Sequence, residues 1–184
     1  MKIKAIILFV LLSGPVFGQK VQKNFWKDPF PRKPSGVWEF YDFKGELEQT
    51  YDFTKDSLIY QKTFPQASNV KYRAITGSDT LLTKLDTPPI LIGGSAVVMR
   101  TLTNNLKYPP EARERRIQGR VIISFMVASD GKASDFKIQT GIGSACDEEA
   151  LRVIKLIHNK WYPGILNGKR VSTIYTIPVF FRLG

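Results

Sequence analysis

The chain has 184 residues, of which 43% are hydrophobic and 23% are charged, a balance typical of a folded protein and not of a disordered one. Lys and Arg outnumber Asp and Glu by 27 to 16, and the resulting formal charge of +11 suits an anionic partner. A single Cys excludes an internal disulfide, and one Cys with one His gives too few soft ligands for a structural zinc site. The sequence therefore predicts no metal site and no cofactor.

The first 18 residues have the layout of a secretory signal peptide. Basic residues precede an apolar run at residues 5–12, and a small-residue pattern ends before Gln19. Gly14 and Pro15 break the run, whereas a membrane-spanning helix needs about 20 apolar residues. We therefore predict signal cleavage near Gly18, with an uncleaved N-terminus that anchors the chain to the inner membrane as the alternative.

Two segments precede the main domain. Residues 19–35 combine prolines with basic residues, which predicts a basic arm without a helix or central strand. Residues 36–87 are rich in aromatic residues, and a Tyr-Asp-Phe triplet at residues 41–43 recurs at residues 51–53, a spacing typical of short strands joined by turns. This pattern predicts a small antiparallel β meander, and it resembles the aromatic hairpin repeats called MORN-like.

A change of pattern at Pro88 and Pro89 marks the start of a C-terminal domain, residues 88–184. Residues 90–184 hold 14 basic and 7 acidic residues, so most of the positive charge lies here. Apolar spacing predicts short helices and strands in alternation: helices at 97–106, 111–117 and 147–159, and strands at 120–127, 134–140 and 171–183. The expected fold is α+β, with a three-stranded antiparallel sheet packed against two or three short helices.

The last predicted strand contains Pro178, which has no N–H to donate to a neighbouring strand and is therefore typical of a sheet edge or bulge. An edge strand presents unpaired backbone groups to which another chain can add as a strand, and self-pairing into a homodimer is one possible outcome. Thr173 and Thr176 are expected to point outward. The predicted partner-binding edge consists of Val171, Ser172, Thr173, Ile174, Tyr175, Thr176 and Ile177.

No catalytic site is predicted. Asp147, Glu148 and Glu149 are consecutive at the start of a predicted helix, so they cannot face one another across a substrate as an acid and base pair does. Their charges instead favour the positive end of the helix. Nucleic acid is disfavoured as a partner because the signal peptide predicts export.

Seven motifs follow one another in the C-terminal domain: Tyr-Pro-x-Glu-Ala-Arg at 108–113, Gln-Gly-Arg-Val at 118–121, Asp-Gly at 130–131, Asp-Glu-Glu-Ala-Leu at 147–151, Trp-x-Pro-Gly at 161–164, Asn-Gly-Lys at 167–169 and Tyr-Thr-Ile-Pro-x-Phe-Phe at 175–181. Together they resemble the C-terminal domain of the TonB family of energy transducers over about 90 residues. The preceding residues 88–94 resemble the lead-in of such transducers from Bacteroidetes-like bacteria.

The resemblance implies a periplasmic module that binds TonB-dependent outer-membrane receptors by strand addition and supports energised transport of siderophores, cobalamin or glycans. It also implies inner-membrane motor proteins of the ExbB/ExbD type as partners. The secondary contact residues would lie around the Tyr-Pro turn and on one short basic helix: Asn105, Lys107, Tyr108, Arg113, Arg115 and Arg116.

The N-terminal half departs from full transducers, which carry a spanning helix and a long proline-rich spacer. This chain has a signal-like start, a short arm and the aromatic segment in their place. The alternative function is therefore an envelope-structural module that binds peptidoglycan or a glycan through Trp38, Tyr41 and the basic surface.

Overall fold

The computed structural model describes residues 22–24, 34–42, 44–62, 70–157 and 160–183. The predicted signal peptide and most of the predicted arm lie outside these residues. Within the described part, no helix combines the length and the apolar character needed to cross a bilayer.

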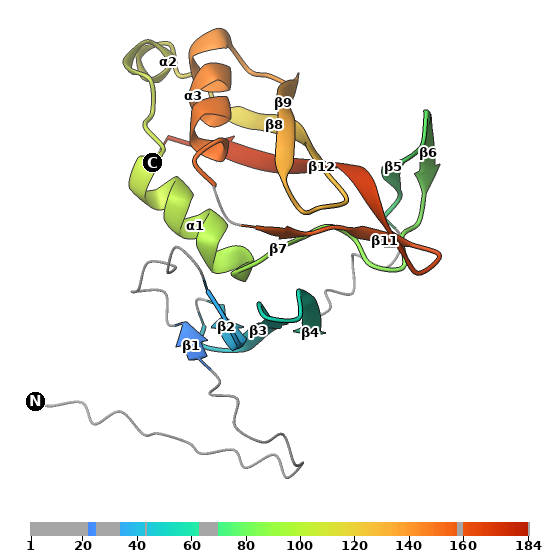
Figure 1. The fold of residues 1–184 in the computed structure, drawn as a ribbon. Helices are drawn as coiled ribbons and strands as arrows, with labels where there is room; N and C mark the ends of the chain where they lie inside the picture. The colour runs from blue at the N-terminus through green and yellow to red at the C-terminus, as the bar shows by residue number, and fades with distance from the viewer. Residues whose placement is uncertain (1–21, 25–33, 43, 63–69, 158–159, 184) are drawn as a thin grey trace, which may run out of the picture.

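A four-stranded sheet forms the N-terminal half, in the order β1-β2-β3-β4 (Figure 1). β2 (Val37–Tyr41), β3 (Leu47–Asp52) and β4 (Ser57–Gln61) are antiparallel neighbours, which confirms the predicted meander. β1 (Gln22–Asn24) adds to β2 in parallel, which the sequence did not predict. One face is apolar because aromatic residues recur at alternate positions: Trp38, Phe40 and Tyr51 pack with Ile92.

A larger sheet forms the C-terminal half, in the order β6-β5-β12-β8-β9. β8 (Gly119–Val127) lies between β12 (Lys169–Phe181) and β9 (Ala133–Thr140), and these three antiparallel strands are the sheet expected from the sequence. The hairpin of β5 (Tyr72–Thr76) and β6 (Asp79–Thr83) extends the sheet beyond β12. Strand pairing therefore divides residues 36–87 between two sheets.

Two short pairings complete the strands. β11 (Gly164–Leu166) forms a hairpin with the start of β12. β7 (Ile90–Leu91) pairs with β10 (Trp161–Tyr162), which joins the entry of the C-terminal domain to its last third.

Three helices accompany the larger sheet: α1 (Gly94–Asn105), α2 (Pro110–Glu114) and α3 (Ser144–Ile154). α3 packs on β8 and β9 and also contacts α1. Its buried stripe consists of Cys146, Ala150, Val153 and Ile154, spaced as one face of a helix. The α+β fold class is thereby confirmed.

The core of the C-terminal half is centred on Trp161, which is 3% exposed. Its ring lies 5.3 Å from the Phe125 ring and 5.1 Å from the Tyr175 ring, centroid to centroid. The Trp161 backbone N–H also donates to the carbonyl of Gly131 in the β8–β9 turn. Trp161 therefore links the turn, the central strand and the final strand.

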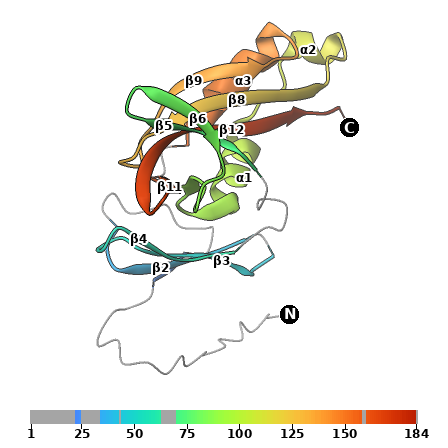
Figure 2. The same ribbon diagram turned by 90° about the vertical axis from the view of Figure 1, so that its right-hand side faces the viewer.

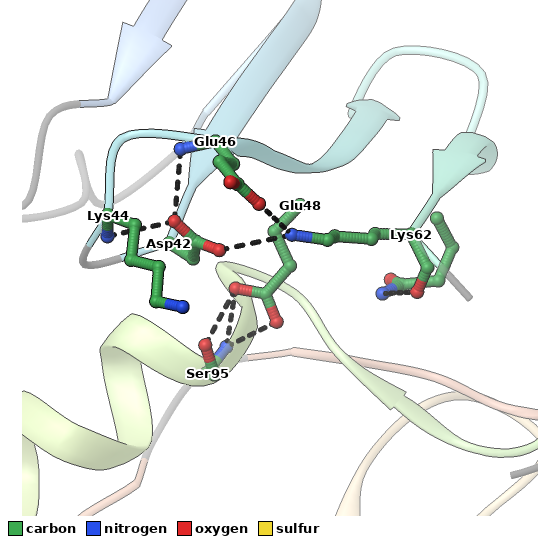
Figure 3. Close-up of polar contacts among 7 residues, drawn as sticks. Asp42, Lys44, Glu46, Glu48, Lys62 and Ser95 are labelled. Carbon is green, nitrogen blue, oxygen red and sulfur yellow. Dashed lines mark hydrogen bonds and ion pairs between the residues drawn. The ribbon is translucent and has the colours of Figure 1, made fainter. Parts of the chain in front are cut away.

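Figure 2 shows the sheet of β2, β3 and β4 next to α1. Polar contacts join the two, and Figure 3 shows those between Glu48 and Ser95. The Glu48 carboxylate on β3 accepts hydrogen bonds from Ser95 at the start of α1. The side-chain amide of Gln49 donates to the Leu91 carbonyl, and its oxygen accepts from the Gly93 N–H. These contacts position the meander against the N-terminal end of α1.

Candidate functional site

The predicted partner-binding edge lies on β12, and the structure pairs part of it on both sides. β8 pairs with residues 173–181 of β12 on one side. On the other side, β5 pairs with Ser172, Thr173 and Ile174. β11 pairs with residues 169–171, before the stretch that β8 covers. The expectation of an unpaired edge is therefore wrong for the three residues that pair with β5, because β5, about 100 positions earlier in the chain, occupies it.

Beyond Ile174, β12 continues with one neighbour. Among the described residues, β8 is the sole strand that pairs with residues 175–181. Figure 1 shows the hairpin of β5 and β6 at the β11 end of β12, while the rest of β12 runs on toward the C-terminus. We name residues 175–181 of β12 the open edge.

Pro178 indicates which backbone groups face outward along the open edge. It lies opposite Ile122 of β8, and the register of this pair is unbroken. Because N–H groups of alternate residues point to the same side of a strand, and proline is accommodated where its nitrogen faces away from the neighbour, Thr176 and Phe180 direct their N–H groups away from β8. Ile174 precedes Thr176 by two residues, so its N–H points to the same side of β12. On that side Ile174 pairs with Arg73 of β5.

The side chains of the open edge alternate between the core and the helix-free face of the sheet. Ile177, Val179 and Phe181 are buried, whereas Thr176, Pro178 and Phe180 are exposed. Thr176 therefore points outward as predicted. Thr173 does not: it is fully buried opposite Ala74, so the expectation of an outward position is wrong.

An aromatic pair marks the point where β5 leaves β12. The rings of Tyr72 and Tyr175 are nearly parallel, with centroids 6.4 Å apart. Burial raises the pKa of the Tyr175 hydroxyl, so this group stays protonated at physiological pH. Tyr175 therefore serves as packing at the start of the open edge.

The other end of the open edge is basic, a feature that the sequence reasoning missed. Phe180 is 51% exposed, and the Arg182 guanidinium carbon lies 5.4 Å from its ring centroid. Arg120 of β8 is paired with Phe180 on its other side and is exposed. Pro178, Phe180 and Arg182 occupy alternate positions, so the sequence could have predicted that Phe180 and Arg182 lie on the same exposed face. Arg120 lies beside Phe180 only because of the register between β8 and β12.

Comparison with known proteins finds a family model that matches the C-terminal part of the chain. Residues 104–183, which include α2, α3, β8, β9 and β12, match the family model described as Gram-negative bacterial TonB protein C-terminal. Residues 104–183 are therefore similar to TonB C-terminal domains. This similarity supports a TonB-like role in energy transduction.

Solved structures of TonB C-terminal domains are among those similar to this chain. The solution structure of the Helicobacter pylori domain has 22% identity and a TM-score of 0.37, and the match covers 50% of this chain and 87% of that one. For the Pseudomonas aeruginosa domain the values are 23%, 0.32, 61% and 94%. A comparison with curated proteins found no match.

Two predicted contact residues, Asn105 and Lys107, hold the end of α1 and the segment after it against α3. The backbone N–H of Lys107 donates to the Glu149 carboxylate, 2.7 Å away, and the Asn105 carbonyl accepts from Arg152. The Asn105 side-chain amide donates to the Thr101 carbonyl. The ion pair with Arg152 lowers the pKa of Glu149, so the carboxylate that anchors this turn stays ionised near neutral pH.

The Tyr-Pro turn is likewise part of the packing. The Tyr108 hydroxyl donates to the Ile117 carbonyl, and its ring meets the Phe181 ring edge-on at 5.5 Å. Burial raises the pKa of this hydroxyl. Tyr108 therefore fixes the segment that precedes α2 against the end of β12.

The three arginines that follow do not share one helix as predicted. α2 ends at Glu114, so Arg113 alone lies in it, while Arg116 has a left-handed backbone with φ of 53°. Arg115 forms an exposed ion pair with Glu111, with 3.4 Å between nitrogen and oxygen. All three arginine side chains are exposed, so they remain available to an anionic partner without forming one helical face.

The predicted glycan-binding residues, Trp38 and Tyr41, make contacts within the meander. Trp38 is 8% exposed and its indole N–H donates to the Ser35 carbonyl. The Tyr41 hydroxyl donates to Glu39, and burial together with this bond raises its pKa to about 12. Trp38 therefore presents no open ring face of the kind that sugars stack upon.

Proposed function

We propose that the mature chain is a periplasmic module that binds TonB-dependent outer-membrane receptors by adding a receptor segment as a strand to the open edge. The observation that carries the proposal is that residues 175–181 of β12 are paired by β8 alone among the described residues. This binding supports energised uptake of siderophores, cobalamin or glycans, coupled to an inner-membrane motor of the ExbB/ExbD type. Binding, and not catalysis, is its contribution.

The open edge suits an added strand because its backbone is presented in a fixed register. Because the Pro178 nitrogen faces away from β8, the N–H groups of Thr176 and Phe180 also face away from β8, toward the incoming segment. Carbonyls of alternate residues face the same way. Backbone hydrogen bonds supply the affinity in this mode of recognition, and alternate side chains supply the specificity. The buried residues between them keep the strand rigid, which lowers the entropic cost of binding.

The hairpin of β5 and β6 limits where the segment can bind. β5 occupies Ser172, Thr173 and Ile174, so a strand that leaves β5 in place can extend along seven residues, 175–181. Self-pairing of the chain into a homodimer is confined to the same stretch of β12. Compared with the predicted site at residues 171–177, the open edge lacks the first four residues and gains four residues, 178–181, at the other end.

The secondary residues contribute to association. Arg113, Arg115 and Arg116 are exposed cations on the connection between α1 and β8 and would speed the encounter with acidic receptor loops. Asn105, Lys107 and Tyr108 would act by holding this connection in place through the contacts described above.

A proline substitution with a matched control tests the proposal. Thr176→Pro removes an outward N–H near the start of the open edge, and an edge position tolerates proline, as Pro178 already shows. Thr176→Ala alters the side chain and keeps the N–H. The measurement is calorimetric titration with peptides from the periplasmic N-termini of TonB-dependent receptors, with circular dichroism to establish folding.

We expect Thr176→Pro to weaken binding by at least about tenfold and Thr176→Ala to change it by less than about twofold, because the lost contact is a backbone hydrogen bond. Absence of binding by the wild-type protein would contradict the proposal. So would a folded Thr176→Pro variant that binds as tightly as wild type.

A further inference from the structure

The helix-free face beside the open edge carries cations at both ends. Arg73 lies in β5 opposite Ile174, where the edge begins. Arg182 and Arg120 lie at the far end: the Arg182 guanidinium lies over the Phe180 ring, and Arg120 is opposite Phe180 in the register of β8 and β12. All three arginines are exposed, and within the described chain none of them is within ion-pair distance of a carboxylate.

The far end places a cation beside an exposed aromatic ring. Arg182 follows Phe180 by two residues, so both side chains project from the same face of the extended chain. The contact of the guanidinium with the Phe180 ring holds the positive charge over this ring. A residue added opposite Phe180 would place its side chain about 5 Å away, within reach of the ring and of Arg182.

We infer that the open edge selects an extended segment of about seven residues that carries Asp or Glu at the position opposite Phe180, where Arg182 and Arg120 supply the complementary charge. This inference rests on the proposed function, because it concerns the segment that the open edge receives. It names charge at one register position as the source of specificity. It also gives a role to the contact between the exposed Phe180 ring and Arg182.

A random heptapeptide library displayed on phage tests the inference without knowledge of the natural receptor. The library is selected against the wild-type protein and against Arg182→Gln, and selected peptides are measured by fluorescence anisotropy with Glu or Gln at the enriched position. Lys132→Gln is the control for net charge, since Lys132 lies in the turn at the opposite end of β8 and is paired with Asp130.

We expect selection on wild type to enrich an acidic residue at one position. Replacing that residue by Gln should weaken binding about fivefold for wild type and for Lys132→Gln, but less than about twofold for Arg182→Gln, as is typical of a partly exposed charge pair. Arg182→Lys should retain part of the preference, because it keeps the charge and loses the planar contact with the ring.

The outcomes separate this inference from the proposed function. If peptides bind in a manner sensitive to Thr176→Pro but show no acidic preference, the inference is overturned and strand addition stands. If no peptide binds, both fail. Binding of phosphatidylglycerol vesicles that is lost in Arg182→Gln, with no acidic preference among peptides, would assign these arginines to a membrane surface and overturn the inference.

Discussion

The Glu48 carboxylate caps helix α1 through Ser95, a residue 47 positions away (Figure 3). Its two oxygens accept the Ser95 backbone N–H at 2.9 and 3.1 Å, and one of them accepts the Ser95 hydroxyl at 2.8 Å. α1 has no cap of its own, because Gly93 at the N-cap has no side chain and the first turn contains no acidic residue. The meander therefore supplies the negative charge that the helix N-terminus favours.

Glu48→Gln should lower the free energy of unfolding by about 1 kcal/mol, and Glu48→Ala by about 2 kcal/mol, the range for a lost helix cap with buried donors. The measurement is the midpoint of urea denaturation. Glu46→Gln is the control, since Glu46 pairs with Lys62 at the surface and should cost less than about 0.5 kcal/mol. Equal losses at the two positions would contradict the capping role.

Asp56 makes stability depend on pH in the acid range. It receives hydrogen bonds from Lys160, from Tyr51 and, at 2.8 Å, from Arg170. Burial alone would raise its pKa, but these three donors outweigh burial and hold the pKa well below the ordinary value of 3.8. Because the folded state favours the ionised form, the contribution is complete above about pH 5 and is lost as the pH falls below 3.8.

Asp56→Asn should therefore cost about 1 kcal/mol at pH 7, a value reduced for solvent screening, and progressively less between pH 4 and pH 2. Urea denaturation at several pH values measures this. Asp135→Asn is matched in backbone, since Asp56 and Asp135 have φ of 52° and 55°, and it removes no ion pair within the described chain. A constant difference between wild type and Asp56→Asn across this range would rule out the charge effect.

Trp161→Ala should lower the free energy of unfolding by about 3 to 5 kcal/mol, the range for truncation of a core tryptophan. The side chain loses contact with the rings of Phe125 and Tyr175 at once. Trp161→Phe retains a ring and should cost less. An unchanged urea midpoint for Trp161→Ala would refute its place at the centre of the core.

The turn between β8 and β9 requires glycine at position 131 for two reasons that a pair of variants can separate. Gly131 has φ of +84°, and an added Cβ would lie 2.2 Å from the Trp161 carbonyl oxygen. Gly168 has φ of +72° and no heavy atom within 4 Å of an added Cβ. Gly168→Ala should cost about 1 kcal/mol for the left-handed backbone alone, and Gly131→Ala at least twice as much. Similar thermal midpoints for the two variants would show that the close contact has no effect.

Local sequence patterns predicted most elements of the C-terminal domain. A continuous apolar run predicted the strand around Phe125, and alternation predicted the strand around Ile177. The 3.6-residue spacing of Ala150, Val153 and Ile154 predicted α3. Helix ends were less well predicted: α2 stops at Glu114, because the turn at Arg116 takes a left-handed backbone that spacing does not reveal.

The candidate site was predicted in part. Pro178 correctly indicated that β12 has an open side, because a missing N–H is a property of the residue itself. It did not indicate where the open side begins. β5 covers Ser172, Thr173 and Ile174, and nothing in its own sequence specifies which strand it pairs with.

The sequence by itself determined the α+β class, the order of the elements, the motifs of the TonB family and the presence of an open edge, because each depends on neighbouring residues along the chain. Tertiary structure alone decided that Glu48 caps α1, that Arg120 lies beside Phe180 and that β5 shortens the edge. These relationships join residues 47 to about 100 positions apart, and they depend on strand register and on burial between the two sheets. Propensity and periodicity encode what a segment forms, whereas its partners are selected by the packing of the whole chain.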